Sequence, residues 1–81
     1  MQVKLYPNPT FNGNATLELK GVKANVTVTA IGLLGNTLAH YTINKDGKIS
    51  LPASSLTSGT YSIVVSTGKE RKVLKWINIK L

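Results

Sequence analysis

Apolar residues alternate with polar residues along most of this chain, and turn-forming residues interrupt the alternation every eight to twelve positions. A period of two is typical of strands with one buried face, because successive side chains of a strand point to opposite faces of its sheet. No stretch has the period of about 3.6 residues that marks an amphipathic helix. The pattern therefore predicts an all-β fold. We expect seven strands, over residues 3–6, 15–19, 26–31, 37–43, 48–51, 60–66 and 71–80.

Seven short antiparallel strands in 81 residues most economically form two packed sheets, an immunoglobulin-like β-sandwich. No repeat or linker divides the chain, so we expect a single domain over residues 1–81. Cysteine is absent, which excludes disulfides and thiolate metal sites as sources of stability. Strand-like sequence begins within two residues of Met1, so we interpret Met1 as an added start residue and the chain as a fragment of a longer protein.

The expected turns come from residues with special backbone preferences. In YPNP, residues 6–9, neither proline has an N–H to give to a sheet, so this motif must end the first strand or leave a sheet edge. Residues 8–14 should form a loop, and the sequence NKDG at 44–47 predicts a hairpin. Gly59 should adopt a positive φ where the sixth strand begins, and Tyr61 should then point into the core with its hydroxyl near the rim.

The last expected strand has a lysine among its inward residues. Its inward set should be Val73, Ile77 and Ile79, which leaves Lys75 on the core face. Either a β-bulge or a lysine whose ammonium reaches solvent would resolve this, and the sequence does not choose between them. Before the sixth strand, residues 52–59 should form a crossing segment that Leu56 anchors to the core.

Charge and side-chain chemistry exclude several classes of protein. The net charge is +7, but the basic residues are scattered outside the last thirteen positions, so we interpret them as solvated strand faces. His40 is the single histidine, there is no nucleophile elbow, and the carboxylates Glu18, Asp46 and Glu70 lie far apart. We therefore expect no catalytic residue, no metal, no cofactor and no enzyme activity. No apolar run reaches the roughly 20 residues that cross a bilayer, so we expect no transmembrane segment.

Several short motifs follow one another in a fixed order: YPNP with a glycine soon after, IGLLGN at 31–36, LPASSLTSGTYSIVV at 51–65, and a basic, apolar final strand. In this order the chain resembles, over residues 3–81, the type A C-terminal sorting domain of the type IX (Por) secretion system of certain Gram-negative bacteria. At the mid-domain turn Asn36 departs from the family habit of a basic residue after glycine. The sorting-recognition residues implied by the resemblance are Pro7, Asn8, Pro9, Gly13, Gly35, Gly59, Tyr61, Lys72, Lys75 and Lys80.

The resemblance implies a secretion signal that directs a cargo protein through the outer-membrane translocon. Its implied partners are the translocon, shuttle components and a sortase-like cysteine protease that commonly cleaves before the domain. Its implied location is the periplasm in transit, and then the cell surface or the medium. The cargo, cleavage or retention of the domain, and the oligomeric state stay open.

Two other interpretations compete with the sorting domain. An extracellular adhesion or carbohydrate-binding β-sandwich would expose two or three aromatic side chains on a concave face. A nucleic-acid-binding barrel would concentrate lysine and arginine on one face, with Trp76 as a stacking platform. A single tryptophan is a thin platform, and packing explains it better, so we expect no nucleic-acid partner.

Overall fold

The computed structural model describes residues 1–51 and 56–81. These residues form strands and no helix, which confirms the predicted all-β fold. The described residues form eight strands rather than the seven expected. They are β1 (Gln2–Tyr6), β2 (Thr10–Phe11), β3 (Ala15–Lys20), β4 (Val26–Ile31), β5 (Thr37–Ile43), β6 (Gly47–Leu51), β7 (Gly59–Ser66) and β8 (Arg71–Ile79).

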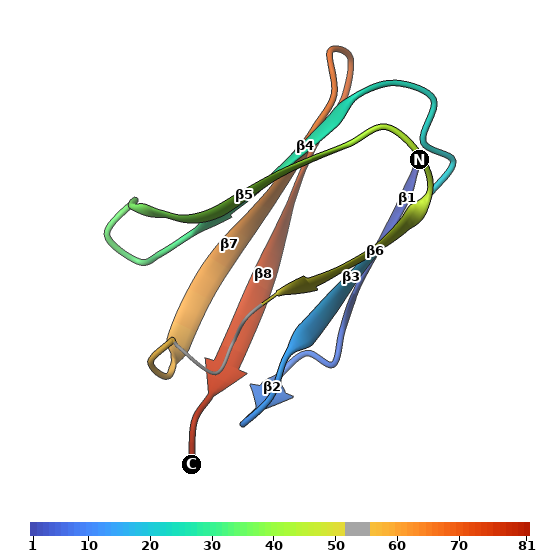
Figure 1. Cartoon of the computed structure of the whole chain (residues 1–81). Coiled ribbons are helices and arrows are strands. Elements are labelled where there is room, and N and C mark those ends of the chain that lie inside the picture. The colour runs from blue at the N-terminus through green and yellow to red at the C-terminus, as the bar shows by residue number, and fades with distance from the viewer. Residues whose placement is uncertain (52–55) are drawn as a thin grey trace.

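The strands of the described residues lie in two sheets that form two layers (Figure 1). We call the sheet β1-β3-β6 the small sheet and the sheet β2-β8-β7-β4-β5 the large sheet. Neighbouring strands are antiparallel except for β2, which pairs in parallel with β8. The molecule measures 38 × 22 × 16 Å, and its N-terminus and C-terminus lie at opposite ends (Figure 1).

The core lies between the two sheets and comes mainly from β3, β4 and β7. Buried and half-buried residues alternate along β3 and β4, and along β7 from Tyr61 onward, as their sequence pattern predicts. The buried apolar residues are Ala15, Leu17, Leu19, Val26, Val28, Ala30, Leu51, Tyr61, Ile63, Val65 and Trp76. In β5 the alternate residues Ala39, Tyr41 and Ile43 are only half-buried, because β5 is the edge of its sheet.

The strand β8 faces the core with the opposite set of residues from the one predicted. Trp76 and Asn78 are 1% and 2% exposed, whereas Val73 is 59% exposed. Lys75 is exposed too, and the pairing of β8 with β7 continues past it without a register shift, so no bulge is present. If a strand turns its other face to the core, every buried side chain becomes exposed and every exposed one becomes buried. In β8 burial of the large indole ring of Trp76 decides which face is buried.

Residues 44–47 connect the two sheets and do not form the predicted hairpin. The strand before them, β5, pairs with β4, whereas the strand after them, β6, pairs with β3 in the small sheet. The Asp46 carboxylate accepts a hydrogen bond from the Val22 N–H at 2.8 Å, which ties this connection to the one between β3 and β4. The hairpin prediction is wrong because a turn motif predicts only that the chain reverses locally. It does not predict which sheet the next strand joins.

The chain also changes sheets after β1, at the YPNP motif. As predicted, the prolines end the first strand, and both X–Pro bonds in this motif are cis. Thr10 and Phe11 then pair in parallel with Asn78 and Ile79 of the large sheet. The predicted loop over 8–14 is therefore wrong at these two positions, where a strand too short to show any period forms.

Candidate functional site

Three segments meet at the end of the molecule that holds the C-terminus: residues 7–12, residues 56–61 and residues 75–81 (Figure 1). We call this region the C-terminal corner. The first segment lies along one edge of β8, and the second leads into β7 along the other edge. The last residues of the chain are therefore held from both sides.

Asn8 begins the contacts along the outer edge of β8. Its Nδ2 donates to the Lys75 carbonyl at 2.7 Å, and its Oδ1 accepts from the Ile77 N–H at 3.0 Å. These are the two bonds that the backbone of a parallel strand would make opposite Trp76. Since Pro7 and Pro9 have no N–H, neither can donate to β8, and the asparagine side chain supplies a donor there together with an acceptor.

Asn12 ends the same row of contacts. Its N–H donates to the Ile79 carbonyl at 3.2 Å, and its Oδ1 accepts from the Leu81 N–H at 2.8 Å. On the other edge, the Lys80 N–H donates to Ser58 Oγ at 2.7 Å, and that hydroxyl is 3.3 Å from the Lys80 carbonyl. Terminal residues are often the least ordered part of a domain, but here side chains fix them on both edges.

Thr10 lies between the two asparagines and faces the core. It is 1% exposed, and its Oγ1 accepts from Trp76 Nε1 at 2.9 Å while donating to the Pro7 carbonyl at 2.7 Å. A buried indole N–H needs an acceptor, and a hydroxyl can accept and donate at once. The Trp76 ring also packs on Tyr61, with ring centroids 5.5 Å apart and tilted by 45°. Packing is therefore the role of Trp76, as expected.

The segment 56–61 accepts hydrogen bonds from the remaining buried polar side chains of the corner. The Tyr61 hydroxyl donates to the Thr57 carbonyl at 2.6 Å, and Asn78 Nδ2 donates to the same carbonyl at 3.2 Å. Tyr61 is 8% exposed with its hydroxyl at the rim, which confirms the prediction for this residue. Leu56 packs against the core, as predicted, whereas positions 52–55 of the predicted crossing segment lie outside the described residues. In the described part of the chain every buried side-chain N or O atom has a partner.

Gly59 does not have the backbone conformation that its sequence context predicted. Among the described glycines only Gly21 and Gly35 have positive φ, at 77° and 83°. Gly59 instead continues β7 and pairs with Asn78. A Cβ at this position would meet the Tyr61 ring at 4.0 Å, an ordinary contact distance. The prediction is wrong because the turn before β7 ends earlier in the chain.

The structure brings most of the predicted recognition residues to the corner and leaves others outside it. Those in the corner are Pro7, Asn8, Pro9, Gly59, Tyr61, Lys75 and Lys80. Gly13 directly follows Asn12, and Gly35 lies in the turn between β4 and β5. Lys72 lies at the opposite end of the molecule, where its Nζ donates to the Met1 carbonyl at 2.8 Å. The sequence prediction missed Thr10, Asn12 and Asn78; the polar spacing at 8, 10 and 12 was the available signal.

An apolar groove adjoins the corner. It has a volume of about 520 Å³ and lies between the β4–β5 turn and residues 56–61. Leu56 and Tyr61 line one side of it, and Leu33 and Leu34 the other. Both turn leucines are almost fully exposed, at 86% and 93%. This end of the molecule therefore presents apolar surface to solvent.

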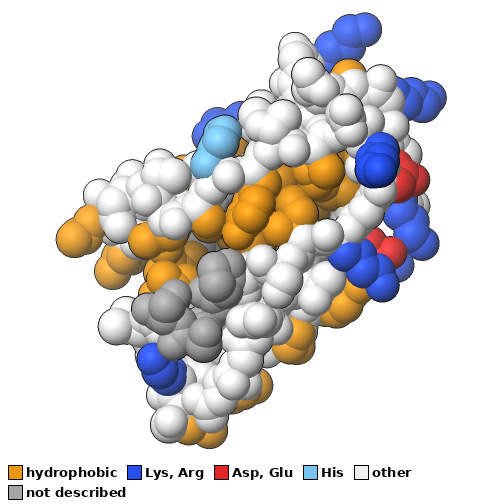
Figure 2. All heavy atoms as spheres, viewed as in Figure 1, with side chains coloured by type: hydrophobic (Ala, Val, Ile, Leu, Met, Phe, Trp, Pro, Cys, Tyr) orange, Lys and Arg blue, Asp and Glu red, His pale blue; other side chains and the backbone are white. Residues whose placement is uncertain are grey.

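The opposite end is basic. Residues scattered in the sequence gather there, and Figure 2 shows most of the visible lysine and arginine side chains at the end with the N-terminus. By strand direction and pairing, this end includes Lys20, Lys23, Lys45, Lys48, Lys69, Arg71 and Lys72. The pKa of the Asp46 carboxyl lies below its ordinary 3.8 because the N–H groups of Val22 and Gly21 donate to it and Lys20 is near.

In the described part of the chain, His40 and Asp46 have different hydrogen-bond partners. His40 Nδ1 lies 3.1 Å from Thr29 Oγ1 on the outer face of the large sheet, whereas Asp46 bonds with Val22. Residues 1–51 and 56–81 contain no group of three or more acidic, histidine or cysteine side chains that could hold a metal ion. The same residues include no helix of the length and apolarity needed to cross a membrane.

Comparison with known families identifies the chain. No curated protein matches it. The family model of the secretion system C-terminal sorting domain, however, matches residues 4–80, nearly the whole length. This match does not support the adhesion-module interpretation. The chain therefore belongs to the secretion system C-terminal sorting domain family and is a C-terminal signal for type IX secretion.

Proposed function

We propose that the C-terminal corner is the surface by which the secretion machinery reads this signal. What supports the proposal is that seven residues expected to take part in recognition meet there, around a terminal strand held on both edges. A fixed strand end presents the same side chains in every copy, so a receptor binding it loses little conformational entropy. The exposed Lys75 and the apolar groove beside the corner supply charge and contact area.

The partners in this proposal are the outer-membrane translocon and its shuttle components. A longer exported protein carries the domain as a single immunoglobulin-like label, crosses the periplasm and reaches the cell surface or the medium. Commonly a sortase-like cysteine protease then cuts the cargo from such a label. The label itself has no catalytic role in this scheme, and it binds its partners without a cofactor.

A reporter fusion tests the proposal. Residues 2–81 are placed after a signal peptide and a soluble reporter in a host with a type IX system, and the reporter is measured in the periplasm, on the surface and in the medium. We expect export. In the variant Lys75→Glu we expect export to fall severalfold, because a surface charge in the corner is reversed, with a thermal midpoint close to that of the unchanged domain.

The matched control is Lys72→Glu, a change of the same type in the same strand but at the opposite end. It should reduce export less than Lys75→Glu does. Equal losses for the two variants would refute the corner as the recognition surface while leaving the signal function intact. Retention of the unchanged fusion in the periplasm, with a normally folded domain, would show that this chain alone does not suffice for export.

A further inference from the structure

The two sheets leave one side of the sandwich open. The small sheet ends at β6 and the large sheet ends at β5, and no strand of the described residues pairs with the outer edge of either. On the other side the chain itself closes the sandwich, because residues 7–12 carry it from β1 to the edge of β8. Within residues 1–51 and 56–81, therefore, no strand lies beside β6 and over β5.

Exposure of the inner side chains follows this asymmetry. In β4 the inward residues Val26, Val28 and Ala30 are no more than 2% exposed, whereas Tyr41 and Ile43 of the neighbouring β5 are half-buried. In the small sheet Leu17 of β3 is fully buried, while the adjacent Ile49 of β6 is half-buried. Figure 2 shows hydrophobic side chains at the bottom of a hollow between these two edges.

We propose that this open side, the β5–β6 slot, accepts one extended segment of a partner protein as an added β-strand. The segment would hydrogen-bond with the free edge of β6, and its alternate apolar side chains would cover Ile49, Tyr41 and Ile43. Addition of a strand to a sheet edge is a recurrent mode of peptide recognition, in which backbone bonds give affinity and alternate side chains give specificity.

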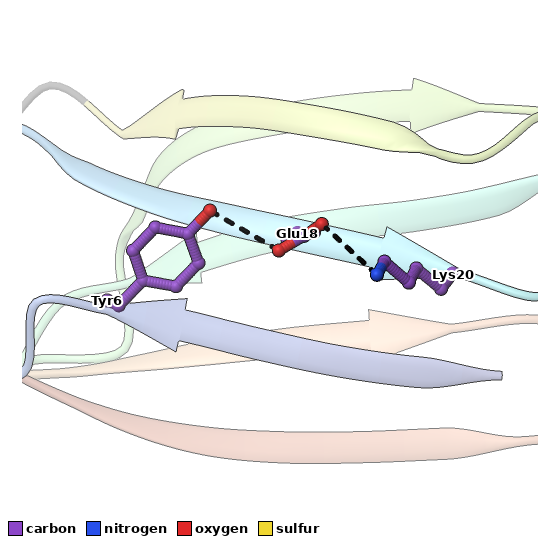
Figure 3. Close-up of polar contacts among 3 residues, drawn as sticks. All are labelled: Tyr6, Glu18 and Lys20. Atoms are coloured by element: carbon purple, nitrogen blue, oxygen red, sulfur yellow. Dashed lines mark hydrogen bonds and ion pairs between the residues drawn. The ribbon is translucent and has the colours of Figure 1, made fainter.

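The charges on the outer face of the small sheet indicate which residues the partner segment would carry on its own outer face. Cross-strand pairing places Lys4, Glu18 and Lys48 in one row. Figure 3 shows how Glu18 is engaged: its Oε1 accepts from the Tyr6 hydroxyl at 3.3 Å, and its Oε2 lies 3.9 Å from Lys20 Nζ. Lys48 has no ion pair within the described residues.

An added strand would place one residue directly opposite Lys48, at the short Cβ distance at which opposite charges attract. The exposed Lys45 lies at one end of the same slot. The segment therefore alternates apolar and acidic residues. A second copy of this chain is a poor occupant, because each copy carries a net charge of +7.

The test uses the purified chain and a blocked peptide of about eight residues that alternates valine and glutamate. We expect saturable chemical-shift changes in β5 and β6, with slower amide hydrogen exchange along β6. A peptide with lysine in place of glutamate should bind about two- to fivefold more weakly for each position that meets a lysine. Lys48→Glu should reverse this order of preference.

Lys4→Glu is the matched control, since it makes the same change on the other side of Glu18 but at the β1 edge, and it should leave the preference unchanged. Binding at β1, no saturable binding, or a dimer formed through β5 and β6 in sedimentation would each overturn the proposal. The proposal goes beyond the sorting function and does not depend on it, because no step of this test uses export.

Discussion

At Thr10 one hydroxyl holds together two parts of the chain that are far apart in sequence. Its bonds with Pro7 and Trp76 join the segment after β1 to the terminal strand inside the core. Asn78 plays a comparable part on the other edge through Thr57. Apolar contacts are non-directional, whereas these groups bond only in one arrangement, so the polar residues fix how the corner closes.

We expect Thr10→Val to lower the free energy of unfolding by about 1–3 kcal/mol. The substitution keeps the shape of the side chain but leaves the Trp76 indole N–H buried without its acceptor. Denaturant melts measure the change. Thr42→Val, on the exposed face of β5, is the control and should stay within about 0.5 kcal/mol. Equal midpoints for the two variants would show that the buried bond adds nothing to stability.

Gly35 and Gly59 should respond differently to alanine. Gly35 has φ of 83°, a left-handed conformation that costs an alanine about 1 kcal/mol, although the surrounding space is open. Gly59→Ala should change stability by less than about 0.5 kcal/mol, because its backbone is extended and its Cβ would meet only an ordinary contact. Thermal melts of both variants decide the matter. A larger loss at Gly59 would contradict this account of β7.

At the scale of elements, the local sequence pattern was sufficient to predict a strand and its buried face where one face is clearly apolar. The predicted bounds of β4 and β5 agree with the structure, and the alternate apolar residues of β3, β4 and β7 lie in the core. The prediction of the inward residues failed for β8, because apolar residues occupy both faces of this strand. The alternation therefore fits either face as the buried one, and only the contacts of Trp76 decide between them. The sheet that β6 joins depends on long-range pairing that the NKDG motif does not encode.

The connection between β5 and β6 should make stability depend on pH through Asp46. Its folded pKa is lowered by the N–H groups of Val22 and Gly21, so its contribution is complete well above 3.8 and is lost as the pH falls through the lowered folded pKa. The difference in unfolding free energy between the unchanged chain and Asp46→Asn should therefore shrink below pH 3.8. Urea melts across acidic pH measure it, and a constant difference would argue against this linkage.

For the whole molecule, the order of short motifs carried the family assignment, which the match over residues 4–80 confirms. The corner itself could be predicted only in part. Proline and glycine motifs are visible in the sequence, but Thr10 and Asn12 act through contacts across more than sixty residues. Asn78 of β8 acts through a contact with Thr57, before β7. The basic end and the apolar end likewise emerge only when the strands are arranged in space.

The opposite placement of the two termini has a mechanical consequence. A protein joined through residue 1 would hang from one end of a body 38 Å long, while the C-terminal corner occupies the other end. Bulk at the point of attachment would not obstruct a receptor that approaches from the far side. With docking at the corner, as proposed above, one such label could serve cargo proteins of different size and shape, because the cargo is attached at the far end of the body.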